Sequence, residues 1–453
     1  MSVTSMIFLF CFLPVALFLY YIAPDKAKEY VLLALSLVFY ALGSLEFVLL
    51  FVIATVITVI LGRIIDRVSK KPVRIILLVA GILVNVSLLG YYKYFDTVLL
   101  PLGISFFTFK AISYLVDVFT KKAELSKNPL HDALYLSFFA QIQSGPLSRY
   151  NEMKPDYTKE RFGLFADGAM RFIIGFGKKV LIANILSNVT NEIFTSPKES
   201  FSTAYIWLGS ICFSLQLFLD FAGYSDMAIG ISEMFGYRCR ENFDYPYMTE
   251  SVSGFWRRWH ISLSEWFRDY VYIPLGGSRN RNKYRVYINL LAVWLLTGIW
   301  HGTSLNFIAW GLGYFVLISF EKMTGFPKKL PNRFLKAVYR ILTLLFINFE
   351  WVLFKAQNLK SGLIIIREMI LFHRNEIADA RTLFLIKDNA FFIAAALVLC
   401  FPLVPFAEKK LENKKALRVA FEIITGLIAL FGFTWAVSFV VAGQNNPFLY
   451  ANF

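Results

Sequence analysis

The sequence predicts an all-α, polytopic membrane protein with about 11 transmembrane helices, together with re-entrant or interfacial helices. Three observations lead to this fold class. Hydrophobic residues make up 57% of the chain and charged residues only 17%, whereas soluble proteins contain about 45–50% and about 25%. The apolar residues are grouped in runs long enough to cross a bilayer, and the Lys and Arg residues are concentrated between those runs.

The apolar runs define the expected spans. They cover residues 5–23, 30–44, 46–62, 75–91, 98–119, 132–147, 168–186, 203–222, 286–320, 337–354, 390–406 and 416–442. One crossing takes about 20 residues, so the run 286–320 is expected to form two helices with a turn near Gly302-Thr303. No polar block or Ser/Gly/Pro-rich linker separates the runs. The chain is therefore expected to form one membrane domain over residues 1–453.

The excess of positive charge is explained by membrane topology. Lys and Arg number 46 against 31 Asp and Glu, a net charge of +15, and such an excess marks cytoplasmic loops in multispanning proteins. Nucleic acid is therefore not an expected partner. Segments 63–74, 322–340 and 408–418 are expected to be cytoplasmic, and the balanced segment 356–389 is expected outside, together with both termini including Phe453. The four cysteines have neither metal-ligand nor disulfide spacing.

Two of the four histidines lie in or beside apolar segments, where burial of a polar side chain costs free energy. His301 is inside an apolar stretch and His260 lies in an aromatic, charged segment, whereas His131 and His373 lie elsewhere. Ionisable groups at membrane depth often have a function. A lone histidine there is more often an interhelical hydrogen-bonding group than a catalyst. A neutral imidazole can nevertheless accept a proton from a hydroxyl near neutral pH, as a general base does.

The segment 255–270 has the pattern of an interfacial or re-entrant amphipathic helix. It is too charged to span a membrane. Helical spacing would place one set of residues on a single face: Trp256, Trp259, Leu263, Trp266 and Tyr270. Arg257 and Arg258 would serve either as lipid anchors or as a ligand site, and three nearby acids are possible partners for them: Asp220, Asp226 and Asp244.

Several segments resemble the signatures of the membrane-bound O-acyltransferase family, and more narrowly its alginate O-acetylase (AlgI-like) branch. Two of them are Phe-Trp-Arg-Arg-Trp-His-Ile-Ser at the start of 255–277 and Leu-Thr-Gly-Ile-Trp-His-Gly at 296–302. Four others lie at 101–109, 141–146, 221–227 and 241–247. The motif-rich core covers about 101–320, and the similarity weakens after about residue 356.

The resemblance implies a fold of many helices around a central funnel and a set of site residues. His301 corresponds to the family's active-site histidine and His260 to its second motif histidine. The expected acyl-CoA- or substrate-binding residues are Arg257, Arg258, Trp259, Ser262, Trp266, Arg268 and Trp300. The arginines would bind CoA phosphates, Gly298 and Gly302 would let substrate approach the backbone, and Trp259 and Trp300 would narrow a tunnel.

The function implied is transfer of acetyl from cytoplasmic acetyl-CoA across a bacterial cytoplasmic membrane, for O-acetylation of an extracytoplasmic polysaccharide. The acceptor would be a cell-wall polymer, an exopolysaccharide or an alginate-like polymer. A secreted SGNH-type partner protein is expected to carry the acetyl group, membrane lipid surrounds the chain, and no cofactor or metal is expected beyond the donor acetyl-CoA. Two alternatives stay open. One is D-alanyl-type acyl transfer to a wall polymer, and the other is a non-enzymatic transporter of a glycan precursor, which would tolerate replacement of His301.

Overall fold

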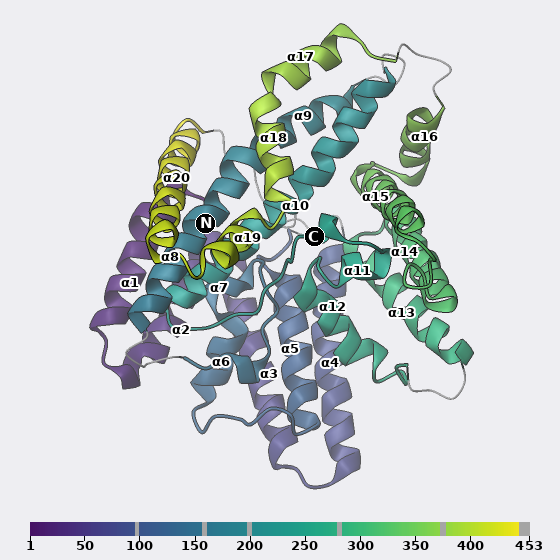
Figure 1. The fold of residues 1–453 in the computed structure, drawn as a ribbon. Helices are drawn as coiled ribbons and strands as arrows, with labels where there is room; N and C mark the ends of the chain where they lie inside the picture. Colours follow the sequence, from purple (N-terminus) through teal and green to yellow (C-terminus); the bar gives the residue numbers. More distant parts are fainter. Residues whose placement is uncertain (96–98, 156–160, 197–201, 279–282, 372–376, 444–453) are drawn as a thin grey trace. The chain divides into compact units, whose positions relative to one another are not determined.

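The computed structural model describes residues 1–95, 99–155, 161–196, 202–278, 283–371 and 377–443 (Figure 1). Over these ranges the chain is helical, with one isolated antiparallel bridge between Pro155 and Tyr237 and no strand. The predicted all-α class is confirmed. His373 and Phe453 lie outside the described residues. Two compact units can be distinguished, and a single membrane domain over the whole chain stays a prediction.

Unit 1 comprises Met1–Phe176, Gly223–Glu241 and Val437–Phe453. Within it α3, α4 and α5 pack against one another, and α2 packs against α1 and α6. The hydroxyl of Tyr20 donates to the carbonyl oxygen of Phe235 at 2.6 Å, which ties the first helix to the end of α10. Its elements are η1 (Phe8–Phe12), α1 (Leu13–Ile22), α2 (Asp25–Gly43), η2 (Leu45–Phe47), α3 (Val48–Arg67), α4 (Lys71–Tyr94), α5 (Ile104–Phe119), α6 (Pro129–Ser137), α7 (Phe139–Ile142), η3 (Tyr150–Glu152) and most of α8 (Arg161–Gly177).

Unit 2 comprises Gly177–Ala222 and Asn242–Ala436. In it α13 packs along α14, α14 along α15, and α15 along α16. Three helices contribute residues to both units: α10 (Thr203–Met234), α20 (Lys415–Val441) and α8, whose last residue Gly177 belongs to unit 2. The other elements are η4 (Lys178–Ala183), α9 (Asn184–Thr195), η6 (Pro246–Met248), α11 (Val252–Trp256), α12 (Ile261–Phe267), η7 (Arg268–Tyr272), α13 (Lys283–His301), α14 (Leu305–Thr324), α15 (Arg333–Lys355), α16 (Leu359–Ile370), α17 (Ala380–Asp388), α18 (Ala390–Leu399) and α19 (Leu403–Leu411).

Side-chain caps define where several unit 2 helices begin. Asn332, Asn358 and Asp379 each accept a hydrogen bond from a backbone N–H in the first turn of α15, α16 and α17. Such a cap satisfies one of the N–H groups that a helix start leaves without a partner. The turn predicted in the run 286–320 is confirmed, because α13 ends at His301 and α14 begins at Leu305.

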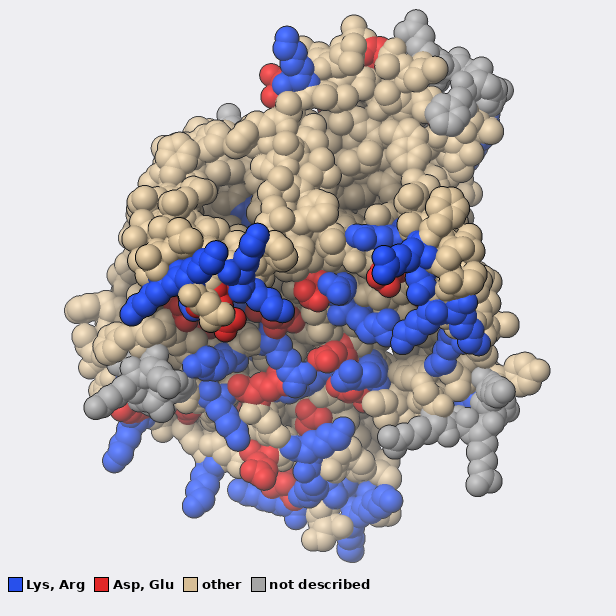
Figure 2. Space-filling view, viewed as in Figure 1, with Lys and Arg blue, Asp and Glu red and all other residues tan. Residues whose placement is uncertain are grey.

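Six helices of the described chain are long and apolar enough to cross a membrane, or seven if the bent pair α17–α18 is one span. The six cover Leu45–Arg67, Lys71–Tyr94, Phe162–Thr195, Thr203–Met234, Arg333–Lys355 and Lys415–Val441. The remaining predicted runs also form helices, but these are shorter or less uniformly apolar, so the count is smaller than the 11 or so expected from sequence. Figure 2 shows broad surface areas without charged side chains, as expected of a protein in contact with lipid.

Candidate active site

His301 lies at the end of α13, at the tip of the close-packed pair formed by α13 and α14. A Cβ atom on Gly298 would lie 2.7 Å from the carbonyl oxygen of Phe307, and one on Gly302 would lie 2.6 Å from the Phe307 ring. These glycines therefore let the two helices approach closely. The expectation that they make room for substrate is wrong, because Phe307 already fills that space.

Aromatic rings enclose the His301 imidazole. Its ring centre lies 4.5 Å from that of Trp300, and 5.0 Å from those of both Trp310 and Phe354, which present tilted or edge-on contacts. Only 5% of His301 is exposed to solvent. An imidazole in such surroundings can act on a bound hydroxyl while water is kept away from a reactive ester.

His260 lies at a break in the motif segment. The single helix predicted over 255–270 is wrong, because α11 ends at Trp256, α12 begins at Ile261, and His260 between them has a φ of +44°. This left-handed conformation is unfavourable for an L-residue. It is held by the backbone N–H of Ile261, which donates to the carbonyl oxygen of Asn242 at 2.9 Å. The predicted one-sided stripe of aromatic residues therefore does not form.

Asn242 also orients the His260 ring. Its side-chain oxygen lies 3.1 Å from His260 Nδ1 and accepts the Ser262 hydroxyl at 2.9 Å. Because an amide oxygen only accepts, Nδ1 is the protonated ring nitrogen in this contact. Burial lowers the pKa of His260 to about 3, so the imidazole is neutral at physiological pH. The face of the ring is covered by Phe221, 4.6 Å away between centres.

The two histidines belong to one aromatic cluster. Trp259, which precedes His260, lies 4.9 Å from Trp351. Trp351 in turn lies 5.7 Å from Phe354, one of the rings against His301. The structure thus brings both predicted catalytic histidines to the same core of unit 2, although residues 260 and 301 come from different elements.

A basic pocket of about 430 Å³ opens beside this cluster. Three cations line it: Arg257, Arg268 and Lys322. Arg268 also pairs with Asp269 at 2.8 Å, whereas within the described part of the chain Arg257 makes no ion pair with a carboxylate. The full lining is Ser253, Trp256, Arg257, Leu263, Ser264, Phe267, Arg268, Tyr272, Ser278, Leu290, Val293, Trp294, Thr297, Ile318 and Lys322.

One wall of the basic pocket leads toward His301. Four residues of α13 line the pocket, and they recur at helical spacing: Leu290, Val293, Trp294 and Thr297. His301 follows Thr297 by four residues, so it continues the same helix face about 6 Å further along the axis. A ligand that extends along this wall would therefore reach the histidine from the pocket.

Glu321 anchors α11, which supplies part of the lining of the basic pocket. Its carboxylate is 4% exposed and accepts the backbone N–H groups of Val252 and Ser253 at 2.6 and 2.8 Å. It also accepts the hydroxyl of Tyr339 at 2.9 Å. These N–H groups begin α11, the short helix that carries Ser253, Trp256 and Arg257 into the pocket. Sequence reasoning missed Glu321, although it directly precedes the basic segment 322–340.

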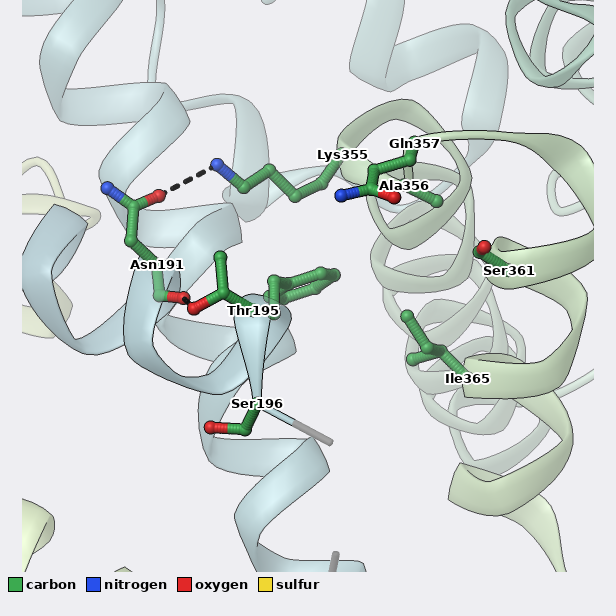
Figure 3. Close-up of a pocket in the computed structure, with 9 residues that line it drawn as sticks. Asn191, Thr195, Ser196, Lys355, Ala356, Gln357, Ser361 and Ile365 are labelled. Carbon is green, nitrogen blue, oxygen red and sulfur yellow. Dashed lines mark hydrogen bonds between the residues drawn. The ribbon is translucent and has the colours of Figure 1, made fainter. Parts of the chain in front are cut away.

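A second pocket, also of about 430 Å³, lies where α9 faces the end of α15 and the start of α16 (Figure 3). Lys355 reaches across it and donates to the Asn191 side-chain oxygen at 3.0 Å. Asn306, five residues after His301, donates to the carbonyl oxygens of Leu353 and Ala356 at 3.0 Å. Because Phe354 packs on His301 and Ala356 lines this pocket, the pocket wall is linked to the histidine.

The structure divides the predicted binding residues into two groups. Arg257 and Arg268 line the basic pocket, together with Trp256 and Lys322, which were not predicted as binding residues. Lys322 could have been found from the basic segment that it begins. The others make contacts elsewhere: Arg258 pairs with Asp244 at 3.1 Å, Trp259 packs on Trp351, Ser262 donates to Asn242, Trp266 packs on Phe267 and Tyr270, and Trp300 lies against His301.

Of the three acids considered as partners for the motif arginines, only Asp244 has that role. Asp220 pairs with Lys179 at 2.5 Å, and both side chains are 2% exposed. Asp226 pairs with Arg171 at 3.0 Å. The pairing of these two acids with Arg257 or Arg258 is therefore wrong, and Arg257 remains available to a ligand.

Comparisons with known proteins give relatives over most of the chain. The profile of the MBOAT, membrane-bound O-acyltransferase, family matches residues 4–366. A probable alginate O-acetylase AlgI of Pseudomonas syringae pv. tomato is 38% identical over 384 residues, 79% of this chain and 73% of that protein. A peptidoglycan O-acetyltransferase of Helicobacter pylori is 34% identical over 80% of this chain and 79% of its own length. A teichoic acid D-alanyltransferase of Bacillus subtilis is 33% identical over 56% of this chain and 69% of its own.

Proposed function

The chain belongs to the membrane-bound O-acyltransferase family, and on that premise we propose that it takes acetyl from cytoplasmic acetyl-CoA and delivers it for O-acetylation of an extracytoplasmic polysaccharide. Family membership makes the protein a multi-pass membrane O-acyltransferase. The donor, the direction of transfer and the location in a bacterial cytoplasmic membrane belong to the proposal.

The charge and position of the basic pocket support acetyl-CoA as the donor. The basic pocket places Arg257, Arg268 and Lys322 at one part of its wall, and its α13 wall continues to His301. CoA has phosphates at one end and a thioester at the end of a long, thin arm. Guanidinium groups bind phosphates well, with two parallel hydrogen bonds. Phosphates at these cations and a pantetheine arm along α13 would bring the thioester to His301.

The chemical step requires little more than a base and exclusion of water. The acceptor hydroxyl oxygen attacks the thioester carbonyl carbon, a C–O bond forms and the C–S bond breaks. His301 takes the hydroxyl proton and returns it to the departing CoA sulfur, so charge and protons balance. The aromatic rings around His301 keep out water, which would otherwise hydrolyse the acetyl group. His260, neutral and held by Asn242, supports the core next to Trp259 without changing charge.

The acceptor side is assigned to the second pocket. Segment 356–389 is expected outside the membrane from its balanced charge, and this pocket lies at the start of that segment, at Ala356 and Gln357 (Figure 3). Its polar lining suits hydroxyl-bearing ligands: Asn191, Thr195, Ser196, Lys355, Gln357 and Ser361. The named relatives act on alginate, peptidoglycan and teichoic acid. A polysaccharide, or the SGNH-type protein that acetylates it, would receive the acetyl group here.

Purified protein in proteoliposomes tests the proposal. Acetyl-CoA labelled in the acetyl group is supplied on one side, and CoA thiol release and labelled product are measured with and without candidate SGNH-type partners. His301→Ala is expected to lower the rate by about 10²–10⁴-fold. His131→Ala, in α6 of unit 1, serves as the control and should keep activity. Activity of His301→Ala within a few-fold of wild type would contradict the role of His301 as the base. Absence of CoA release by the wild-type protein under all these conditions would favour the transporter alternative, and turnover of a D-alanyl thioester in preference to acetyl-CoA would favour D-alanyl transfer.

A further inference from the structure

A third cavity of unit 2 is apolar and lies between membrane-spanning helices. It has a volume of about 380 Å³ and is lined by residues of α10, η6, α15 and α18, and by Cys400 and Phe401 after α18. Hydrocarbon side chains form most of its wall, among them Leu215, Ile341, Leu344, Leu397 and Phe401. Several of these also have large exposed fractions, such as 59% for Ile341 and 46% for Phe401. The groove is therefore open at the surface that lipid would contact.

The polar side chains at the deep end of the groove bond to one another. The amide nitrogen of Asn348 donates to the Ser214 hydroxyl at 2.9 Å, and that hydroxyl donates to the carbonyl oxygen of Ser210 at 3.0 Å. The Tyr247 hydroxyl donates to the carbonyl oxygen of Ser214 at 2.7 Å. These donors are engaged within the protein, whereas Asn348 Oδ1 has no hydrogen-bond partner among the described residues. A hydrocarbon chain at this end of the groove therefore leaves the donors satisfied.

The other end of the groove holds a single cation, Arg340. Its guanidinium contacts the Met248 sulfur at 3.6 Å, and within the described ranges it pairs with no carboxylate. Arg340 follows Arg333, the start of α15, by seven residues, which places it about 10 Å from that helix end. The segment 322–340 is expected on the cytoplasmic side, which would put Arg340 at the level of lipid phosphates.

The groove can hold the first part of an acyl chain. From Arg340 to Asn348 the rise along α15 is about 12 Å, with Leu344 one turn below Arg340 on the same face. Lys336, one turn above Arg340, is exposed and does not line the groove. A positively charged rim above an apolar slot complements an anionic phospholipid.

We propose that this groove binds one acyl chain of an anionic glycerophospholipid, with its phosphate on Arg340. The inference does not depend on the donor or acceptor of the enzyme. It assigns the groove to a resident lipid instead of a second copy of the chain or a partner helix.

The test is lipid retention by the full-length protein. Wild-type protein is purified in detergent, incubated with phosphatidylglycerol or phosphatidylcholine, washed, and analysed by native mass spectrometry. We expect one retained phosphatidylglycerol per chain and about tenfold weaker retention of it by Arg340→Gln, the loss of one charge-assisted contact. Lys336→Gln removes the same charge one turn away and should retain lipid as wild type does. Leu344→Trp, which fills the slot but keeps Arg340, should also lose the lipid.

The controls separate this proposal from its alternatives. Size-exclusion profiles and thermal unfolding show that each variant is folded, and only folded variants are compared. Equal retention by Arg340→Gln and Lys336→Gln would overturn the proposal, as would equal retention of the neutral and anionic lipids. A wild-type protein that binds no lipid but elutes as a dimer, and becomes monomeric in Leu344→Trp, would assign the groove to a second copy and would also overturn it.

Discussion

Removal of the Glu321 carboxylate should detach α11 from α14 and open the basic pocket. A helix of five residues is too short to be stable by itself, so α11 depends on contacts made from outside. Glu321 supplies two of these at its N-terminus, to the N–H groups of Val252 and Ser253. Since α11 carries Arg257, loss of the carboxylate should affect both stability and donor binding.

The magnitude follows from the hydrogen bonds. In Glu321→Ala two buried N–H donors lose their acceptor, at about 1–3 kcal/mol each, so the folded state should lose about 2–6 kcal/mol. Glu321→Gln keeps one acceptor oxygen and loses the charge, and its cost should be about half as large. Tyr339→Phe removes only the third contact, at 2.9 Å, and should cost about 1–2 kcal/mol.

Two measurements on the same preparations check these values. Thermal unfolding in detergent should give the order wild type, Tyr339→Phe, Glu321→Gln, Glu321→Ala from most to least stable. Initial rates against acetyl-CoA concentration should show KM raised more than kcat is lowered, as expected for lost donor binding. Lys322→Gln, one residue further along α14, should raise KM without a comparable loss of stability. If Glu321→Ala unfolds at the wild-type temperature with an unchanged KM, the anchoring role of Glu321 is refuted.

Three further variants test the site at other points. Arg257→Gln should raise KM for acetyl-CoA about tenfold and leave kcat within a few-fold of the wild-type value. The neighbouring Arg258→Gln should change neither constant. Equal effects of the two variants would contradict the role of the basic pocket in donor binding. Because burial lowers the pKa of His260 from 6.5 to about 3, the unfolded chain binds a proton between these pH values that the folded chain does not. Stability should therefore fall by about 2 kcal/mol more from pH 7 to 5 in wild type than in His260→Gln, and equal falls in unfolding temperature would contradict this. Gly298→Ala should destabilise the protein by about 1–3 kcal/mol, because its Cβ would meet a carbonyl oxygen at 2.7 Å, while Gly432→Ala, which meets nothing within 4 Å, should not, as thermal unfolding would show.

Local patterns in the sequence were sufficient for the fold class, and they singled out two histidines whose catalytic role stays a prediction. Long apolar runs can only be helices in a bilayer, because no water is present to satisfy backbone groups, and the structure has helices at those runs. The helix end at His301 was also predictable, since Gly302 and Thr303 interrupt an apolar run. His260 and His301 stood out because ionisable groups are rare in apolar surroundings.

The arrangement of the site depends on contacts between residues far apart in the chain. The sequence around His260 predicts a continuous helix. In the structure Asn242 bonds to the Ile261 N–H and to the His260 ring, and the helix is interrupted at His260. The sequence around Arg257 and Arg258 does not show which of the two binds a ligand. In the structure Arg258 pairs with Asp244, and this contact distinguishes it from Arg257. Glu321 acquires its role from backbone N–H groups nearly seventy positions earlier. Helical periodicity is a local property, whereas the partner of a hydrogen bond or an ion pair is decided by packing, because buried polar groups must find their partners wherever the folded chain places them.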